Sequence, residues 1–362
     1  MDNEVQLKLG HVPLEAVCAE QGQPFIHISP GNKDLTRTLK CFGGDIQAPY
    51  RATPMYCGRV RDVVIFGRSY ITYEPGLAVL RGQAHRDHDI GEFVRFYVND
   101  IMQEQRSRPE VMEECCFLGG QNNFGHFIFD FLCRLPAFER AGVLHRFPLV
   151  VHDDLDDVWL SFLELYGVAR ERIIKVPRLP ASHYKSDWIT ACPNVYTSDT
   201  YSFWDDGIHD MRRKLLANSG GVGPEKVFLG RRGARHRRLV NEDELWAFLE
   251  SRGFAYPDFT GLTAAEQIRQ VRSAKVIVSI AGAGSTITYF APENCAIIEL
   301  CPPGIAGGFA SLGGATVIGQ TFGRIPTEIV KDDTKQMIDF DMTIDIAVVS
   351  QIVDGELRRQ GI

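Results

Sequence analysis

The densest group of charged side chains in the sequence is a basic loop, in which five arginines and one histidine fall within Arg231–Arg238. The loop follows a predicted strand and precedes a helix that Asn241 could cap, with Asp243 and Glu244 in its first turn. Arginine stays charged and matches phosphate with two parallel hydrogen bonds. Because α/β folds bind ligands at the carboxyl ends of parallel strands, the loop predicts a diphosphate site. A solvated basic loop is the alternative.

A second candidate anion site is the glycine-rich turn Ala281–Gly284, which joins an apolar strand to a predicted helix. Its glycines allow a tight turn and the close approach of a ligand, while N–H groups of the first helical turn point outward. The turn lacks the complete GxGxxG pattern because Ile287 stands where the third glycine would be. A turn selected only for packing is the alternative.

A third segment, Gly119–Asp130, carries a candidate base. Asn122 or Asn123 can cap a helix, which places His126 near its first turn and Asp130 one turn later on the same face. A helix N-terminus favours a neutral imidazole, which can accept a proton, and Asp130 could orient it or act as the base itself. A purely structural role for the histidine is the alternative. A metal site at His126 and Asp130 is disfavoured, because no further ligands stand at a suitable spacing in the sequence.

The elements that would position these groups alternate between apolar strands and amphipathic helices from about residue 113 onward, which indicates βαβ units and parallel sheets. The first hundred residues are β-rich and irregular. The polar run from Pro193 to Ser202 predicts a domain boundary. The acidic run Asp153–Asp157 is predicted to cap a helix rather than to bind a cation. Predicted strands span 115–118, 149–152, 173–176, 226–229, 275–280 and 295–300, and predicted helices span 124–140, 158–166, 206–217, 242–252, 264–271, 285–290 and 345–359.

Composition limits the class of protein. The chain has 362 residues, is 44% apolar and 23% charged, and carries a net charge of -7. This predicts two globular domains and excludes disorder, while the acidic balance argues against general nucleic-acid binding. The nine scattered cysteines form no CxxC pair, which favours a reducing compartment. With no signal-like start and no long apolar run, the expected location is cytoplasmic.

Three of these segments together resemble glycosyltransferase family 61, which includes bacterial capsular-polysaccharide biosynthesis proteins. They are Asn123–His126 with Asp130; the paired arginines of the basic loop with Asn241 and Glu242; and Glu266–Ile268, Ala274, Gly282–Gly284, Pro292 and Glu299–Leu300. The resemblance runs from about Gly119 to Pro302. It departs from the usual family pattern where Ala281 and Ile287 replace a histidine and an asparagine.

The resemblance implies an α/β GT-B-like fold, with two Rossmann-like domains facing a cleft and a β-rich N-terminal extension. The expected domains are an acceptor-side domain over 1–195, a nucleotide-sugar-binding domain over 196–343, and a C-terminal helix over 344–362 packing back on the first domain. It also implies an inverting, metal-independent transfer of a hexosyl or pentosyl group from a nucleotide sugar, with UDP as the expected nucleotide, and no cofactor.

Within this picture, His126 and Asp130 are the expected catalytic residues, and Asn122 and Asn123 face the acceptor or the cleft. The expected donor-binding residues are Arg231, Arg232, Arg237, Arg238, Gly282, Ala283, Gly284, Ser285, Thr286 and Glu299, the last accepting a ribose hydroxyl. No metal ligand is expected.

The expected partners are a nucleotide sugar and an oligosaccharide or glycolipid acceptor, and not nucleic acid. Peripheral association with the inner face of the membrane and a homodimer are left open. The alternatives are a non-catalytic nucleotide-sugar-binding scaffold on the same fold, suggested by Ala281 and Ile287, and a dinucleotide-dependent oxidoreductase, which the incomplete glycine pattern disfavours.

Overall fold

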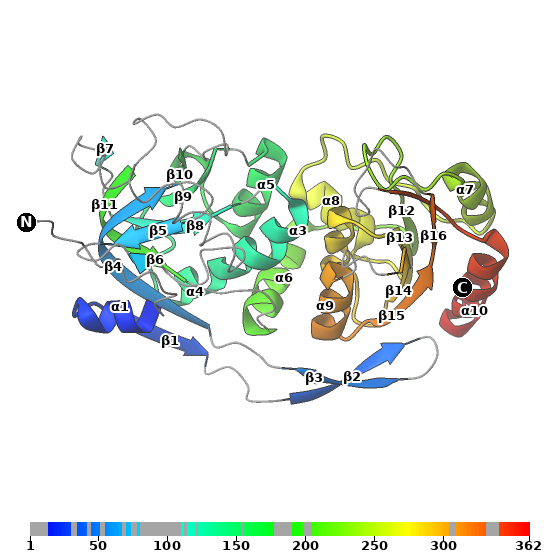
Figure 1. The fold of residues 1–362 in the computed structure, drawn as a ribbon, viewed down its shortest axis with the longest axis horizontal. Coiled ribbons are helices and arrows are strands. Elements are labelled where there is room, and N and C mark those ends of the chain that lie inside the picture. The colour runs from blue at the N-terminus through cyan, green and yellow to red at the C-terminus, as the bar shows by residue number, and fades with distance from the viewer. Residues whose placement is uncertain are drawn as a thin grey trace, which may run out of the picture. The chain divides into compact units, whose positions relative to one another are not determined.

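The computed structural model describes two compact units (Figure 1). The first comprises residues 1–33 and 51–211, and the second comprises 34–50 and 212–362. The predicted boundary after residue 195 therefore differs from the division between the units, which falls after Met211. The residues whose structure is described are 14–29, 35–41, 45–50, 55–66, 70–73, 78–79, 110–111, 114–120, 122–153, 155–176, 190–198, 205–303, 309–330 and 340–362.

The first unit is built on one mixed sheet. Four parallel strands lie in the order β10–β9–β8–β11, and β4, β5 and β6 continue the sheet in antiparallel pairing. The β-rich N-terminal region thus extends the Rossmann-like sheet directly. Two short strands, β1 and β7, pair with β4 and β11. The bounds are β1 (Phe25–Ser29), β4 (Met55–Phe66), β5 (Tyr70–Tyr73), β6 (Ala78–Val79), β7 (Glu110–Val111), β8 (Cys115–Gly119), β9 (Leu149–His152), β10 (Ile173–Val176) and β11 (Thr190–Thr197).

Strand β11 corrects the prediction of a linker at residues 193–202. Despite its proline and its polar residues, the segment through Thr197 lies between β8 and β4, with seven residues of β11 paired to β4. Pro193 is the one residue of its stretch without a partner in that antiparallel register, as expected for a residue that has no N–H to donate. Long-range pairing therefore overrides the local turn signal.

Two helices of the first unit, α3 and α5, begin at side-chain caps. Asp156 accepts a hydrogen bond from the Val158 N–H at 2.8 Å, so the acidic run caps a helix as predicted. The helical run predicted over 124–140 is confirmed, but it changes type three times. The bounds are α1 (Leu14–Glu20), α3 (Phe124–His126), the π-helix η1 (Phe127–Phe131), the 3-10 helix η2 (Leu132–Arg134), α4 (Leu135–Arg140), α5 (Asp157–Tyr166) and the 3-10 helix η3 (Arg170–Arg172).

The second unit contains a parallel sheet in the order β12–β13–β14–β15, extended by β2 and β3. The apolar sequences of β13 and β14 account for their place at its centre, because strands covered on both faces are continuously hydrophobic. The hairpin β2–β3 comes from the N-terminal part of the chain and pairs with β15, which the sequence did not predict. The bounds are β2 (Leu35–Cys41), β3 (Ile46–Tyr50), β12 (Lys226–Leu229), β13 (Val276–Ile280), β14 (Ala296–Cys301), β15 (Thr321–Pro326), β16 (Glu328–Val330) and β17 (Asp341–Thr343).

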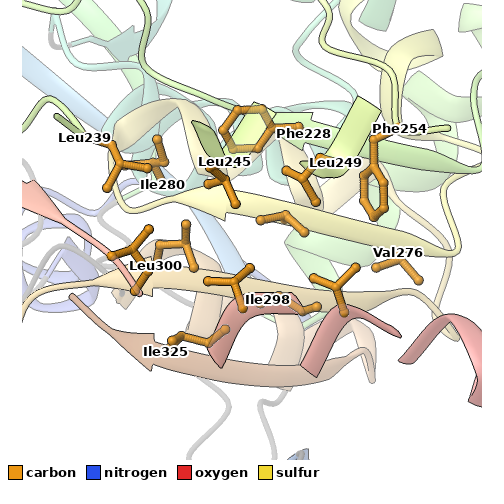
Figure 2. Packing of buried hydrophobic residues seen from close by; sticks show 14 of the residues in the cluster. Phe228, Leu239, Leu245, Leu249, Phe254, Val276, Ile280, Ile298, Leu300 and Ile325 are labelled. Atoms are coloured by element: carbon orange, nitrogen blue, oxygen red, sulfur yellow. The ribbon is translucent and has the colours of Figure 1, made fainter. Parts of the chain in front are cut away.

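Helices cover both faces of this sheet. On one face α8, η5 and α9 lie together, and α7 and α10 pack on the other (Figure 1). Figure 2 shows the core on the α7 side, where side chains from the strands interdigitate with Leu245 and Leu249 of α7. Within the described residues, no helix has the length and apolar character to cross a membrane. The bounds are α6 (Asp205–Ser219), α7 (Glu242–Ser251), α8 (Ala264–Val271), the 3-10 helix η5 (Ala283–Phe290), α9 (Phe309–Ile318) and α10 (Ile346–Gln360).

Helix α10 has the predicted extent, but it packs on the second unit and not on the N-terminal domain as expected. Val349, Val353 and Leu357 join the same buried cluster as Leu249. Arg252, just after α7, also pairs with Asp354 of α10 at 2.9 Å. The apolar stripe of α10 thus completes the second core, because that face of the sheet would otherwise be covered by α7 alone.

This packing predicts different costs for two adjacent valines of α10. Val349 is fully buried and Val348 is 43% exposed. Val349→Ala should lower the free energy of unfolding by about 2 kcal/mol, through lost burial and the cavity left behind. Val348→Ala should change it by less than about 0.5 kcal/mol. Urea denaturation measures both, and equal values would contradict the packing of α10.

Candidate functional site

The parallel register of the second sheet gathers polar groups at one edge. Leu229, Ser279, Glu299 and Arg324 occupy matching positions on β12, β13, β14 and β15. The segments that leave the carboxyl ends of these strands therefore emerge side by side. They include the basic loop after β12 and the glycine-rich turn after β13, and this is the edge where α/β folds bind ligands.

Arg231 is the arginine that lies against the glycine-rich turn. A Cβ placed on Gly282 would overlap Nη1 of Arg231, so only glycine leaves room for the guanidinium here. Nη2 of Arg231 donates to the His236 carbonyl at 3.1 Å. Burial lowers the pKa of Arg231, and the nearby charge of Arg237 lowers it further, while Glu242 opposes the shift. The group nevertheless remains charged, because arginine does not deprotonate in proteins. An anion bound here would relieve both costs.

Several buried polar atoms of this region have no hydrogen-bond partner in the described part of the structure. They include Nε of Arg231, Nε of Arg237 and Oγ1 of Thr286. Such atoms are rare in folded proteins, and a bound ligand or a water molecule would supply their missing hydrogen-bond partner. Arg237 also has φ +56°, a left-handed conformation that is unusual for a residue other than glycine. Backbone strain of this kind is typical of ligand-binding sites.

Two of the other arginines expected to bind the donor are held by carboxylates. Arg232 donates to Asp243 at 2.7 Å. Arg238 donates to Asp341 of β17 through its backbone N–H at 2.9 Å and through Nη2 at 2.6 Å. The bond to its carboxylate is the largest cause of a raised pKa in each guanidinium. These pairs anchor the loop and leave Arg231 and Arg237 as its half-buried arginines.

The turn after β13 leads into a 3-10 helix, and not the α-helix that the sequence suggested. The Ser285 N–H donates to the Gly282 carbonyl at 3.0 Å, and the Ser285 hydroxyl contacts that of Ser279 at 2.8 Å. Ser285 therefore supports the turn from within, and the backbone donors to consider for an anion are those of Ala283 and Gly284. The two departures from the family pattern, Ala281 and Ile287, are both buried.

Glu299 is fully buried near the carboxyl end of β14. Its Oε2 accepts a hydrogen bond from Nη2 of Arg324 at 2.8 Å, and its Oε1 has no partner in the described structure. A buried carboxylate needs such a partner to offset its desolvation. Its predicted contact with a ribose hydroxyl stays a prediction, for which Oε1 is the oxygen to consider.

Glu242 holds the basic loop in place, a role that the sequence did not predict. Its Oε1 accepts hydrogen bonds from the Arg231 N–H at 2.9 Å and from the Tyr256 hydroxyl. The Arg232 N–H in turn donates to the Tyr256 oxygen at 3.2 Å. Burial and the bond to Glu242 raise the pKa of Tyr256, so its hydroxyl stays protonated. Gly230 is required beside them, because a Cβ there would overlap both side chains.

The first unit presents a separate candidate site after β8. Strands β8, β9 and β10 follow one another in one direction, whereas β11 lies on the other side of β8. The strand order thus reverses beside β8, and ligands of open α/β sheets bind at such a switch point. The chain leaves β8 through Gly119 and Gly120, both with positive φ, and enters the helix that carries His126.

His126 and Asp130 lie in contact. Asn123 caps the helix by accepting from the His126 N–H at 3.2 Å, whereas Asn122 is exposed. Nδ1 of His126 lies 2.8 Å from Oδ2 of Asp130. Because an ionised carboxylate only accepts hydrogen bonds, Nδ1 carries the proton, and the lone pair of a neutral imidazole lies on Nε2. The π-helix from Phe127 onward is an irregularity often found at functional sites.

The described residues contain no group of three or more histidine, cysteine or acidic side chains placed to hold a metal ion. Cys115 and Cys116 are fully buried in β8, as predicted for core residues.

The network around Glu242 predicts a difference between two glutamates in the first turn of α7. Glu242→Ala removes the acceptor of two hydrogen bonds and should lower the free energy of unfolding by about 2–3 kcal/mol. Glu244 is exposed, so Glu244→Ala should change it little. Urea denaturation of both variants provides the comparison. A loss that is as large for Glu244→Ala would point to helix-dipole effects and contradict the network.

Comparison with known proteins finds one family that part of this chain resembles. The sequence model of the family described as Glycosyltransferase 61 matches residues 124–298, which begin at the His126 helix and end within β14. No curated protein matches the chain significantly. The family has a GT-B-like fold, in agreement with two units that each contain a parallel-rich sheet. Residues 124–298 of this chain are therefore similar to the glycosyltransferase 61 family of enzymes.

Proposed function

We propose that this enzyme transfers a sugar from a UDP-sugar to a glycan acceptor, without a metal ion and with inversion at the anomeric carbon. The observation that carries the proposal is the half-buried Arg231, whose guanidinium lies against Gly282 at the ligand-binding edge of the second sheet. Bacterial capsule or surface-polysaccharide synthesis is the proposed setting, from the resemblance to capsular-polysaccharide proteins.

In the proposed reaction, the second unit stabilises the leaving group. The bond between the anomeric carbon and the diphosphate oxygen breaks, and negative charge develops on the diphosphate. In this proposal, Arg231, Arg237 and the N–H groups of Ala283 and Gly284 receive this charge. Preorganised donors of this kind are often the largest single contribution to catalysis. A fixed guanidinium thereby takes the role that a divalent cation has in other phosphate chemistry.

The first unit supplies the base. As the acceptor oxygen forms its bond to the anomeric carbon, its proton passes to Nε2 of His126. The imidazolium that forms is stabilised by the carboxylate of Asp130, which lies 2.8 Å from Nδ1. The products are the extended glycan, UDP and a protonated His126 that loses its proton to solvent.

Donor binding can be tested by thermal shift with UDP in EDTA. The wild-type protein should be stabilised, because a ligand that binds only the folded state raises its stability. Arg231→Ala should abolish the shift. The matched control is Arg252→Ala, which removes an arginine of the same unit that pairs with Asp354. A thermal shift that appears only with Mg²⁺ would disprove metal independence. If UDP causes no thermal shift under any condition, the assignment of the donor site is wrong.

The assignment of the base can be tested by mass-spectrometric detection of the product, with nucleotide sugars and simple glycan acceptors. His126→Ala should lower the transfer rate by roughly 10²–10⁴-fold and preserve the UDP-induced shift. His145→Ala changes a half-exposed histidine of the same unit and serves as the control. If His126→Ala transfers the sugar at a near-normal rate, His126 has a structural role and is not the base. Binding without turnover in the wild-type protein would favour the nucleotide-sugar-binding scaffold.

A further inference from the structure

A groove of about 630 Å³ lies on the second unit beside the basic loop. Its volume suits a small organic ligand. Three aromatic side chains, a proline and several polar groups surround it. Its lining includes Arg232, Trp246, Tyr256, Pro257, Asp258 and Phe259.

The groove belongs to the ligand-binding edge of the sheet. Val227 of β12 forms a parallel bridge with Ala255, so the segment around Ala255 lies next to β12, on the side away from β13. The chain leaves this segment at Tyr256, at the same edge where the basic loop leaves β12. Adjacent strands are about 4.8 Å apart, which places the groove roughly two strand spacings, about 10 Å, from the glycine-rich turn.

The aromatic walls are held rigidly. Trp246 stacks on Phe228, with ring centroids 6.3 Å apart and planes 12° apart. Tyr256 packs at 60° to Trp246, and the guanidinium of Arg232 lies 5.1 Å from the centroid of its ring. Trp246, Tyr256 and Phe259 are half-buried, so each retains accessible surface. Rings that are fixed before binding lose little entropy when a flat ligand stacks on them.

The groove is linked to Arg231 through two side chains, those of Tyr256 and Glu242. Tyr256 forms part of its wall and donates its hydroxyl proton to Glu242, which also accepts the Arg231 N–H. The same oxygen of Tyr256 accepts the N–H of Arg232. A ligand that spans the groove and the glycine-rich turn would therefore contact two parts of a single hydrogen-bonded network.

We propose that this groove binds the nucleobase of the donor, stacked on its aromatic walls while Arg231 holds the diphosphate. The inference rests on the proposed function. A nucleobase is flat and uncharged, and in the donor it lies one ribose away from the diphosphate. The exposed Asp258 at the rim is an acceptor for a base N–H. A sugar of the acceptor, the other occupant suited to aromatic walls, has no covalent link to the diphosphate.

Titration calorimetry with UDP and with inorganic pyrophosphate separates the groove from the phosphate site. Phe259→Ala should weaken UDP binding about 10-fold or more, as expected for a lost base–aromatic contact, and leave pyrophosphate binding unchanged. Trp246→Ala should do the same and gives a second, independent variant. Phe248→Ala, a half-buried phenylalanine of the same unit outside the groove, should change neither affinity.

The outcomes distinguish this inference from the proposed function. If the wild-type protein binds neither ligand, the donor site itself fails and the groove assignment fails with it. If UDP binds no more tightly than pyrophosphate, or if both groove variants bind UDP normally, the donor site stands and the groove assignment is overturned. Weakened binding of a glycan acceptor with unchanged UDP binding would reassign the groove to the acceptor.

Discussion

The functional features of the second unit depend on the parallel register of β12, β13, β14 and β15. Parallel strands end at one edge, so segments that are far apart in the chain leave the sheet side by side. This constraint brings Arg231 against Gly282, although they lie 51 positions apart in the sequence. It also places Glu299 opposite Arg324, and the groove of Tyr256 beside the basic loop. The chemistry of the site follows from where the strands end.

The same edge contains polar groups whose burial destabilises the folded protein. Arg231 is partly desolvated, and Glu299 is fully buried with one oxygen unpartnered. Buried groups of this kind normally persist only when they are paired or when they serve a function. Arg324 offsets part of the cost for Glu299, whereas the charge of Arg237 adds to the cost for Arg231 and outweighs the opposing charge of Glu242. The imbalance favours a bound anion.

In the first unit, local structure fixes the orientation of the His126 imidazole. The glycines after β8 turn the chain, Asn123 caps the helix, and the π-helical turn that follows brings Asp130 to Nδ1 of His126. The strand order reverses at this point of the sheet. His126 and Asp130, the proposed base and its orienting carboxylate, therefore lie at the position where open α/β sheets bind ligands.

By itself, the sequence determined the elements that local physics controls. Apolar runs became buried strands such as β13 and β14, and Asp156 and Asn123 became caps, because these features depend on near neighbours in the chain. The contact of His126 with Asp130 could be predicted for the same reason, since helical spacing sets it. The basic loop and the glycine-rich turn were also recognisable as candidate anion sites.

Only the tertiary structure decided the contacts between distant segments. In the structure, the polar run before Thr197 belongs to a central strand, the hairpin β2–β3 pairs with β15, and α10 packs on α7. It also showed that Arg238 is bound by Asp341 whereas Arg231 lies against the glycine-rich turn. Tyr256 proved to be the link between Glu242 and the groove. Pairing and burial free energies accumulate over whole surfaces, so they override local signals that no short stretch of sequence can weigh against them.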